Sequence, residues 1–298
     1  MPEPAPGLAP AGAFVTRFAP SPTGYLHLGH AYSALKAHDA ALEAGGQLIL
    51  RIEDIDQTRA RPAFEAALYD DLAWLGLSWP QPVRRQSEHM ADYHAALARL
   101  EGLGLIYRCF RTRAELVQAV LSAPHGPQAQ VFRGAPLPMA QEAERLARGE
   151  AYAWRLSLER ARAHLGADYE RLRLVETGDA PGTPKGPITA RPDRLGDIVL
   201  ARKDVGVAYH LAVVVDDALQ GISHVIRGAD LVEAAHIQRL LQALLGLPTP
   251  VYRHHRLLMG PDGKRLAKRN GAPALRDLRM AGETVQSVRG RLAALDLA

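Results

Sequence analysis

Thr16–His30, with the sequence TRFAPSPTGYLHLGH, is the stretch whose residue types suit chemistry better than packing. Prolines and glycines punctuate it, and an apolar helical pattern begins at its end. Because a helix start has unpaired N–H groups and the positive end of the helix dipole, such a turn attracts an anion such as phosphate. His27 and His30, one helical turn apart, would face the same ligand. An HxxH pair alone is more often structural, and no third ligand lies nearby for a metal.

A second stretch, Gly260–Arg269, carries four cationic residues within six positions. Its sequence is GPDGKRLAKR. A glycine-containing loop of this kind is either a mobile clamp for phosphate groups or a basic turn in solvent, and the residues alone leave both interpretations open.

Together the two stretches resemble the paired ATP-binding motifs of class I aminoacyl-tRNA synthetases. His27-Leu-Gly-His30 is similar to the HIGH motif. Arg265-Leu-Ala-Lys-Arg269 is similar to the KMSKS motif, with arginine for the usual first lysine and alanine for the serine. The flanking segments resemble the glutamyl branch: RFAPSPTGYLHLGH, then RIEDIDQTR (Arg51–Arg59), YHLAVVVDD (Tyr209–Asp217) and HVIRGADL (His224–Leu231).

The resemblance implies a role for each site residue. Catalysis would rest on neutralising phosphate charge, with His27, His30 and Lys268 as the catalytic residues and Mg²⁺ screening the oxygens. ATP would be bound by His27, Gly29, His30, Arg265 and Lys268. L-Glutamate would lie among Arg17, Phe18, Ala19, Pro20, Ser21, Glu53, Tyr209 and Arg227. Two arginines and one acid complement two carboxylates and one ammonium.

The elements that position these residues are typical of an α/β fold. Phe14–Phe18 and Gln47–Ile52 are predicted to be buried strands on either side of a helix from His30 to about Ala44, giving a parallel, right-handed unit. Ligands of such sheets bind beyond the carboxyl ends of the strands, where Glu53 falls. Asp54 and Asp56 fit exposed turn carboxylates or a helix cap better.

Further along, the pattern predicts two helices within 62–105, joined by a turn at Ser78–Val83. A helix is expected at Ala140–Arg148 and another at Leu231–Leu245. The apolar segments are expected to be buried strands: Gly196–Leu200, Ala208–Val215 and Ile222–Ile226. Ala274–Leu297 is expected to be helical. Tyr209 beside these strands is as compatible with core packing as with a ligand contact.

The expected architecture is therefore a class I synthetase Rossmann-like parallel sheet, split by an inserted subdomain and followed by a helical C-terminal segment. In residue ranges, we expect a disordered tail at 1–12, the halves of the nucleotide-binding domain at 13–105 and 188–255, an RNA-contacting insertion at 106–187, and the KMSKS-like loop with C-terminal helices at 256–298.

Zinc is not expected. Many short glutamyl relatives carry a zinc site in the insertion, built from a CxC pair, a tyrosine and a third cysteine. Here the corresponding residues include Tyr107 and Cys109, and Cys109 is the single cysteine of the chain. One thiolate is too few for such a site. Cys109 is therefore predicted to be an ordinary buried residue.

Composition sets the wider limits. The 298 residues contain no run of 18 apolar residues and no signal-peptide pattern, so we expect a cytoplasmic monomer without a membrane segment. The net charge of +4 is uneven: residues 251–298 hold ten Lys/Arg against four Asp/Glu, +6, which leaves −2 for 1–250. A basic C-terminal part is compatible with a nucleic-acid partner.

The chain stops 29 residues after Arg269, too few for the anticodon-binding domain of a full-length enzyme of this branch. It thus resembles the short members of the branch, the glutamyl-Q tRNA(Asp) synthetases. The resemblance implies activation of L-glutamate by ATP without tRNA and transfer to queuosine at the wobble position, in the anticodon stem-loop of tRNA(Asp). Two alternatives stay open: a truncated enzyme that charges the 3′ end of tRNA(Glu), and a non-catalytic tRNA-binding paralogue.

Overall fold

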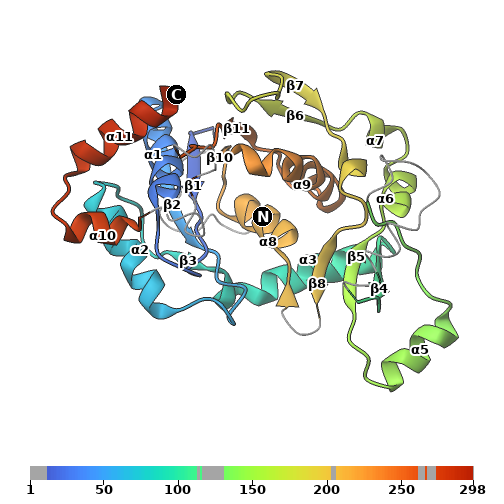
Figure 1. Ribbon diagram of the computed structural model, residues 1–298. Helices are drawn as coiled ribbons and strands as arrows, with labels where there is room; N and C mark the ends of the chain where they lie inside the picture. Colours follow the sequence, from blue (N-terminus) through green and yellow to red (C-terminus); the bar gives the residue numbers. More distant parts are fainter. Residues whose placement is uncertain are drawn as a thin grey trace.

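The structure is a computed structural model that describes residues 12–112, 115, 131–202, 206–260, 266 and 273–297. The first sheet has the order β1-β2-β3, with parallel pairing throughout; its strands are β1 (Val15–Phe18), β2 (Gln47–Ile52) and β3 (Arg84–Arg85). Helix α1 (Leu28–Glu43) connects β1 to β2, so the predicted parallel strand–helix–strand unit is confirmed (Figure 1).

Helix α1 packs closely on the strands because most of its buried residues are alanines, with Leu28, Tyr32 and Leu35 among them. The helix ends before Gly45, whose φ of 60° lies in the left-handed region that glycine adopts without a steric penalty.

A second sheet lies beside the first and has the order β10-β11-β6-β7. Its strands are β6 (Arg173–Glu176), β7 (Gly186–Thr189), β10 (His224–Gly228) and β11 (Val251–His255). The backbone N–H of Ser223 donates to the carbonyl oxygen of Val15 at 3.0 Å, which holds the start of β10 against β1. The strands of both sheets that carry the motif residues therefore lie next to one another.

The prediction of a strand at Ala208–Val215 is wrong, because these residues begin helix α8 (Tyr209–Leu219). Its residues from Leu211 to Asp217 are all buried, with α3 (Met90–Gly102) and α9 (Val232–Leu245) packed against it. A helix covered on several sides loses its polar face, and a short continuous apolar run does not distinguish it from a buried strand. Helix α9 (Val232–Leu245) follows β10 as expected.

The third sheet is antiparallel and has the order β4-β5-β8-β9. Its strands are β4 (Ile106–Cys109), β5 (Ala153–Leu156), β8 (Val199–Arg202) and β9 (Gly206–Val207). Helices α5 (Met139–Ala147), α6 (Leu158–Leu165) and α7 (Ala167–Glu170) lie at the same end of the molecule (Figure 1). Strand pairing crosses the expected boundary at residue 187, since β8 and β9 join this sheet whereas β6 and β7 join the second one.

A buried carboxylate, that of Asp197, organises the segment around Tyr107. Asp197 accepts hydrogen bonds from the hydroxyl of Tyr107 at 2.9 Å and from the backbone N–H groups of Gly134 and Leu158. The guanidinium of Arg155 lies over the ring of Phe132, 4.7 Å from its centroid. Cys109 is buried in β4, as predicted.

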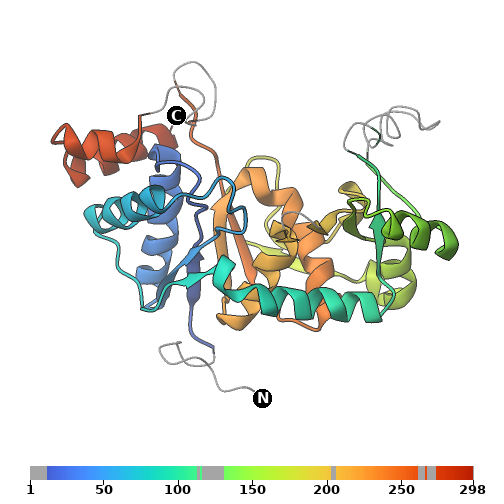
Figure 2. The same ribbon diagram turned by 90° about the horizontal axis from the view of Figure 1, so that it is seen from below.

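Two helices occupy 62–105 as expected, α2 (Pro62–Trp74) and α3 (Met90–Gly102), and the short 3-10 helix η1 (Gln86–His89) precedes α3. Figures 1 and 2 show α3 running from the first sheet to the third. The C-terminal segment forms two helices rather than one, α10 (Leu275–Met280) and α11 (Val285–Leu297), because Gly282 with φ 81° interrupts it. No helix in the described ranges is long and apolar enough to cross a bilayer.

Candidate active site

A cleft of about 610 Å³ lies where β1 and β2 end and beside β10 and β11. Its walls contain every predicted site residue that the structure describes: Arg17, Phe18, Ala19, Pro20, Ser21, His27, Gly29, His30, Glu53, Tyr209 and Arg227. Arg265 and Lys268 lie outside the described residues. Residues far apart in the sequence thus converge on one cavity.

The two histidines cap helix α1. Nδ1 of His27 accepts from the backbone N–H of Gly29 at 3.1 Å, and Nδ1 of His30 accepts from the backbone N–H of His27 at 3.3 Å. A neutral imidazole whose Nδ1 accepts carries its proton on Nε2. The rings stack with centroids 3.8 Å apart, so both imidazoles lie on one wall of the cleft.

Gly29 is required by the close approach of two chain segments. A Cβ at this position would lie 3.0 Å from Cε1 of His27 and 3.2 Å from the carbonyl oxygen of Leu266. Leu266 lines the same cleft, and its backbone N–H donates to the carbonyl of Leu258 at 2.9 Å. Ala274 forms an isolated bridge with His27. Leu266, within the second basic stretch, and Ala274, after it, therefore both lie against the histidine turn.

Arg17 lines the cleft and belongs to a buried network of opposite charges. Nε of Arg17 lies 3.1 Å from Oδ1 of Asp217, and Nη1 of Arg51 lies 2.9 Å from the same oxygen. Burial alone would raise the pKa of Asp217, but the charges of Arg17 and Arg51 lower it by more. The net shift of this pKa is therefore downward, and the carboxylate stays ionised. Among the described residues no acceptor binds the Nη groups of Arg17, so both can donate to a carboxylate ligand.

Glu53 is the acid of the cleft. Its Oε1 accepts from Nη2 of Arg51 at 3.1 Å, and its side chain is 9% exposed. Burial raises the pKa of Glu53, against the opposing effect of Arg51 and Arg17. A buried carboxylate beside the fork of Arg17 suits a ligand that carries both an ammonium and a carboxylate.

Arg227 is held by a relay that begins two strands away in the same sheet, on β6. Its Nε donates to Nε2 of His254 at 3.0 Å, and Nδ1 of His254 donates to the carboxylate of Glu176. Burial lowers the pKa of His254, so the imidazole stays neutral and keeps Nε2 as the acceptor. Nη1 of Arg227 also lies 3.4 Å from the hydroxyl of Tyr209. The relay fixes the guanidinium, whereas Tyr209 is half-buried at the cleft wall.

His210, the next residue of α8, is kept uncharged. Burial, together with the nearby charge of Arg227, lowers its pKa to about 4. Its Nδ1 has no hydrogen-bond partner among the described residues. The positive charge on this side of the cleft therefore comes from Arg227 rather than from the imidazole.

Sequence reasoning missed several supporting residues. Asp216 accepts hydrogen bonds from Arg84 at 2.7 Å, Gln86 at 2.8 Å and Tyr93 at 2.9 Å, and so anchors α8 to the segment after β3. An acid directly after a buried apolar run was the available signal, because a buried charge requires partners. Glu176 and His254 gave no comparable signal, since they lie 78 residues apart on different strands.

The other acids after β2 are structural. Asp54 accepts from the backbone N–H and hydroxyl of Ser87 at 2.9 and 2.6 Å. Asp56 accepts from the hydroxyl of Thr58 at 2.6 Å and pairs with Arg59 in an exposed turn. No group of three or more His, Cys, Asp or Glu within the described ranges is arranged to hold a metal ion.

Comparisons with known proteins find relatives over most of the chain. The model of class I tRNA synthetases (E and Q), catalytic domain, matches residues 13–286. A glutamyl-Q tRNA(Asp) synthetase from Rhodobacter capsulatus is 46% identical over 92% of this chain and 98% of its own length. A glutamate–tRNA ligase 2 from Methylobacterium sp. is 41% identical over 90% of this chain but 57% of its own length. The crystal structure of an Elizabethkingia meningosepticum glutamate tRNA ligase in complex with its amino acid superposes with a TM-score of 0.69 and 29% identity, over 87% of this chain and 52% of that one.

Proposed function

This chain belongs to the family of class I tRNA synthetases (E and Q), and from this premise we propose that it activates L-glutamate with ATP and transfers it to queuosine in tRNA(Asp). The observation that carries the proposal is the cleft in which Arg17, Glu53 and Arg227 converge beside the two histidines. The high identity to named glutamyl-Q tRNA(Asp) synthetases over nearly their full length supports the acceptor.

In the first step an oxygen of the glutamate α-carboxylate attacks the α-phosphorus of ATP. A new C–O–P linkage forms, the bond to the β-phosphate oxygen breaks, and pyrophosphate leaves. Negative charge moves onto the phosphate oxygens, so donors aimed at them stabilise the transition state. We assign this role to His27 and His30 at the start of α1, where the helix dipole adds positive potential.

Glutamate recognition follows from the charges of the pocket. Arg17 offers its Nη fork, Arg227 is fixed by His254, and Glu53 presents a carboxylate. Two guanidiniums bind the two carboxylates of the substrate, and Glu53 binds its ammonium. Glutamine has one carboxylate less, which would leave one buried arginine without its anion and gives strong discrimination against it.

Lys268 is the proposed clamp for the β- and γ-phosphates, with Arg265 beside it in sequence. Leu266, two residues earlier than Lys268, lines the cleft next to Gly29. Mg²⁺ is held in such sites mostly by substrate phosphates and waters, and screens their charge. That mode fits a cleft whose described residues form no three-ligand metal group.

In the second step a hydroxyl of the queuosine cyclopentenediol attacks the adenylate carbonyl carbon. An ester forms, the hydroxyl proton is released and AMP leaves. The test uses [¹⁴C]glutamate and tRNA(Asp) from which the 3′-terminal adenosine has been removed. We expect label on RNA that contains queuosine and none on the same RNA with guanosine at the wobble position. Labelling that requires an intact 3′ end, or that prefers tRNA(Glu), would instead favour charging of a 3′ end and contradict the proposal.

A further inference from the structure

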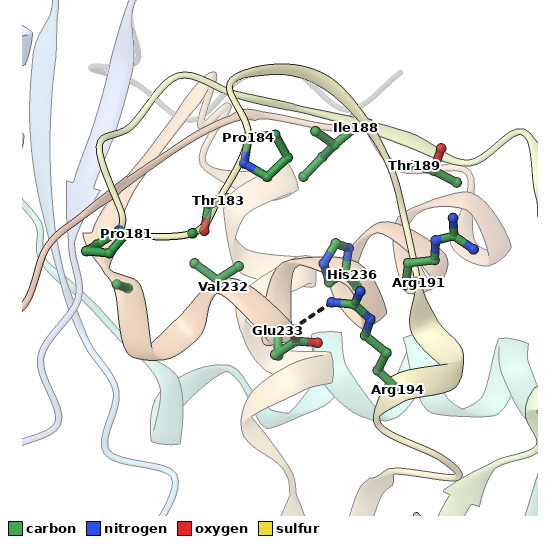
Figure 3. A pocket seen from close by; sticks show the side chains of 12 residues that line it. Pro181, Thr183, Pro184, Ile188, Thr189, Arg191, Arg194, Val232, Glu233 and His236 are labelled. Carbon is green, nitrogen blue, oxygen red and sulfur yellow. Dashed lines mark hydrogen bonds and ion pairs between the residues drawn. The ribbon is translucent and has the colours of Figure 1, made fainter. Parts of the chain in front are cut away.

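A second cavity of about 540 Å³ lies next to the active-site cleft, and Figure 3 shows the side chains that line it. The loop between β6 and β7, the short helix η3 (Pro192–Arg194) and the first turns of α9 enclose it. Its lining consists of Pro181, Gly182, Thr183, Pro184, Ile188, Thr189, Arg191, Arg194, Ala229, Val232, Glu233 and His236. Such a volume exceeds that of one phosphate and suits a nucleotide.

The charge of this cavity is positive. Two arginines and one carboxylate line it. Arg194 pairs with that carboxylate, Glu233, at 3.0 Å, whereas Arg191 has no ion pair or side-chain hydrogen bond within the described ranges. Both arginines are exposed, with Arg191 at the rim in Figure 3. Arg191 can therefore accept an anion without giving up an internal partner.

His236 adds a polar group to the inside of the cavity. It is 5% exposed, and its Nδ1 has no hydrogen-bond partner among the described residues. Burial lowers its pKa, and Arg194 and Arg191 lower it further against the effect of Glu233, so the ring is neutral near pH 7. A neutral imidazole in this position recognises a hydroxyl or base edge, whereas Pro181, Ile188 and their apolar neighbours suit a ribose or base face.

The position of the cavity relates it to the acceptor. Ala229 and Val232 line it, whereas Gly228, Asp230 and Leu231 line the active-site cleft. One segment of chain, from the end of β10 to the start of α9, is thus the partition between the two spaces. A ligand bound here lies beside the place where the adenylate would form.

We propose that this second cavity binds a nucleotide of the acceptor RNA, with its phosphodiester on Arg191 and its ribose or base against His236. The inference rests on the proposed function, since it concerns how the RNA substrate is held for transfer. The bound nucleotide would flank the acceptor nucleotide and steer the modified base toward the cleft. The cationic rim, the neutral polar interior and the apolar face are the three features that a nucleotide requires.

The test compares R191E, R191K and the control R99E, which changes an exposed arginine of α3 that lines neither cavity. Binding of a fluorescent queuosine-containing anticodon stem-loop is followed by anisotropy at several salt concentrations. We expect R191E to raise Kd by about tenfold and to reduce the slope of log K against log salt by about 1 or more. R191K, which keeps the charge, should bind close to wild type, and R99E should be unchanged.

A second measurement separates this inference from the proposed function. Glutamate-dependent ATP–pyrophosphate exchange needs no RNA and should be equal in wild type and R191E, which also shows that the variant is folded. Loss of exchange in wild type would refute glutamate activation, while the anisotropy would still report on the cavity. Equal RNA affinity and salt slope in R191E and wild type, equal losses in R191E and R99E, or a raised KM for ATP in R191E would overturn the inference.

Discussion

At the scale of single residues, each charged side chain that we propose contacts the substrate is held in place by another side chain. Asp217 orients Arg17, Arg51 orients Glu53, and His254 orients Arg227. Such supporting contacts hold a binding group in one geometry before the ligand arrives. The arrangement explains why these charges remain buried without a bound substrate.

Glu53 gives a prediction on pH. Its pKa is raised by burial, so the carboxylate is ionised above this raised value and protonated below it. Because only the ionised form pairs with an ammonium, KM for glutamate should rise as pH falls through that range. E53Q should raise KM by about ten- to a hundredfold and remove this pH dependence. Pyrophosphate exchange measured against pH tests it, with D56N in the exposed turn as the control; parallel pH profiles for wild type and E53Q would rule out the assigned role.

Lys268 gives a prediction on rate. Removing one contact that forms only in the transition state costs on the order of 10²–10³ in kcat. K268A should therefore show that loss in pyrophosphate exchange with a nearly unchanged KM for glutamate. K185A, an exposed lysine outside the cleft, is the matched control. An exchange rate for K268A within a few-fold of wild type would refute the clamp.

At the scale of elements, the start of α1 is the part that the sequence predicted best. The turn, the helix and the two parallel strands around it follow from local signals, namely glycine and proline punctuation and short apolar runs. Helix α8 was misjudged because its burial removes periodicity, and the pairing of β6 with β11 joins residues too far apart for a local pattern to show. The motif residues were found because their types are unusual for packing, whereas Glu176 and His254 were missed because only tertiary structure joins them.

Gly29 gives the prediction for this element. A methyl group there would press on the His27 ring and on the carbonyl of Leu266. G29A should therefore lower kcat/KM for ATP by about tenfold or more, since a displacement of about 1 Å at a reacting site lowers the reaction rate by up to about 10²-fold. G76A tests a glycine with positive φ outside the cleft, so it controls for stability alone. Wild-type kinetics in G29A would show that the close approach is irrelevant to ATP binding.

At the scale of the whole molecule, the C-terminal helices bring distant parts of the chain to α1. Lys36 on α1 lies 2.8 Å from Asp296 on α11, and Arg289 pairs with Asp39 at 3.2 Å. The bridge between Ala274 and His27 continues the same contact toward the cleft. Helix α1 and the C-terminal segment are therefore joined by several contacts beside the cleft.

Stability should depend on pH through the buried histidines. The pKa of His210 is about 4 in the folded chain and about 6.5 when exposed, so the unfolded chain binds more protons between these values and the free energy of unfolding falls as pH falls. Between about pH 7.5 and pH 5 this single group should cost about 2 kcal/mol. Urea unfolding of wild type and H210Q at both values measures it. H210Q should lose less stability by about that amount, and an identical loss in both proteins would contradict the burial of a neutral imidazole.

The central claim is that the cleft activates glutamate by itself. Glutamate-dependent exchange of labelled pyrophosphate into ATP, measured with no RNA present, tests it most directly. The account predicts robust exchange with glutamate, and strongly reduced exchange with glutamine at the same concentration. Exchange that appears only after tRNA(Glu) is added, or that proceeds equally well with glutamine, would contradict it.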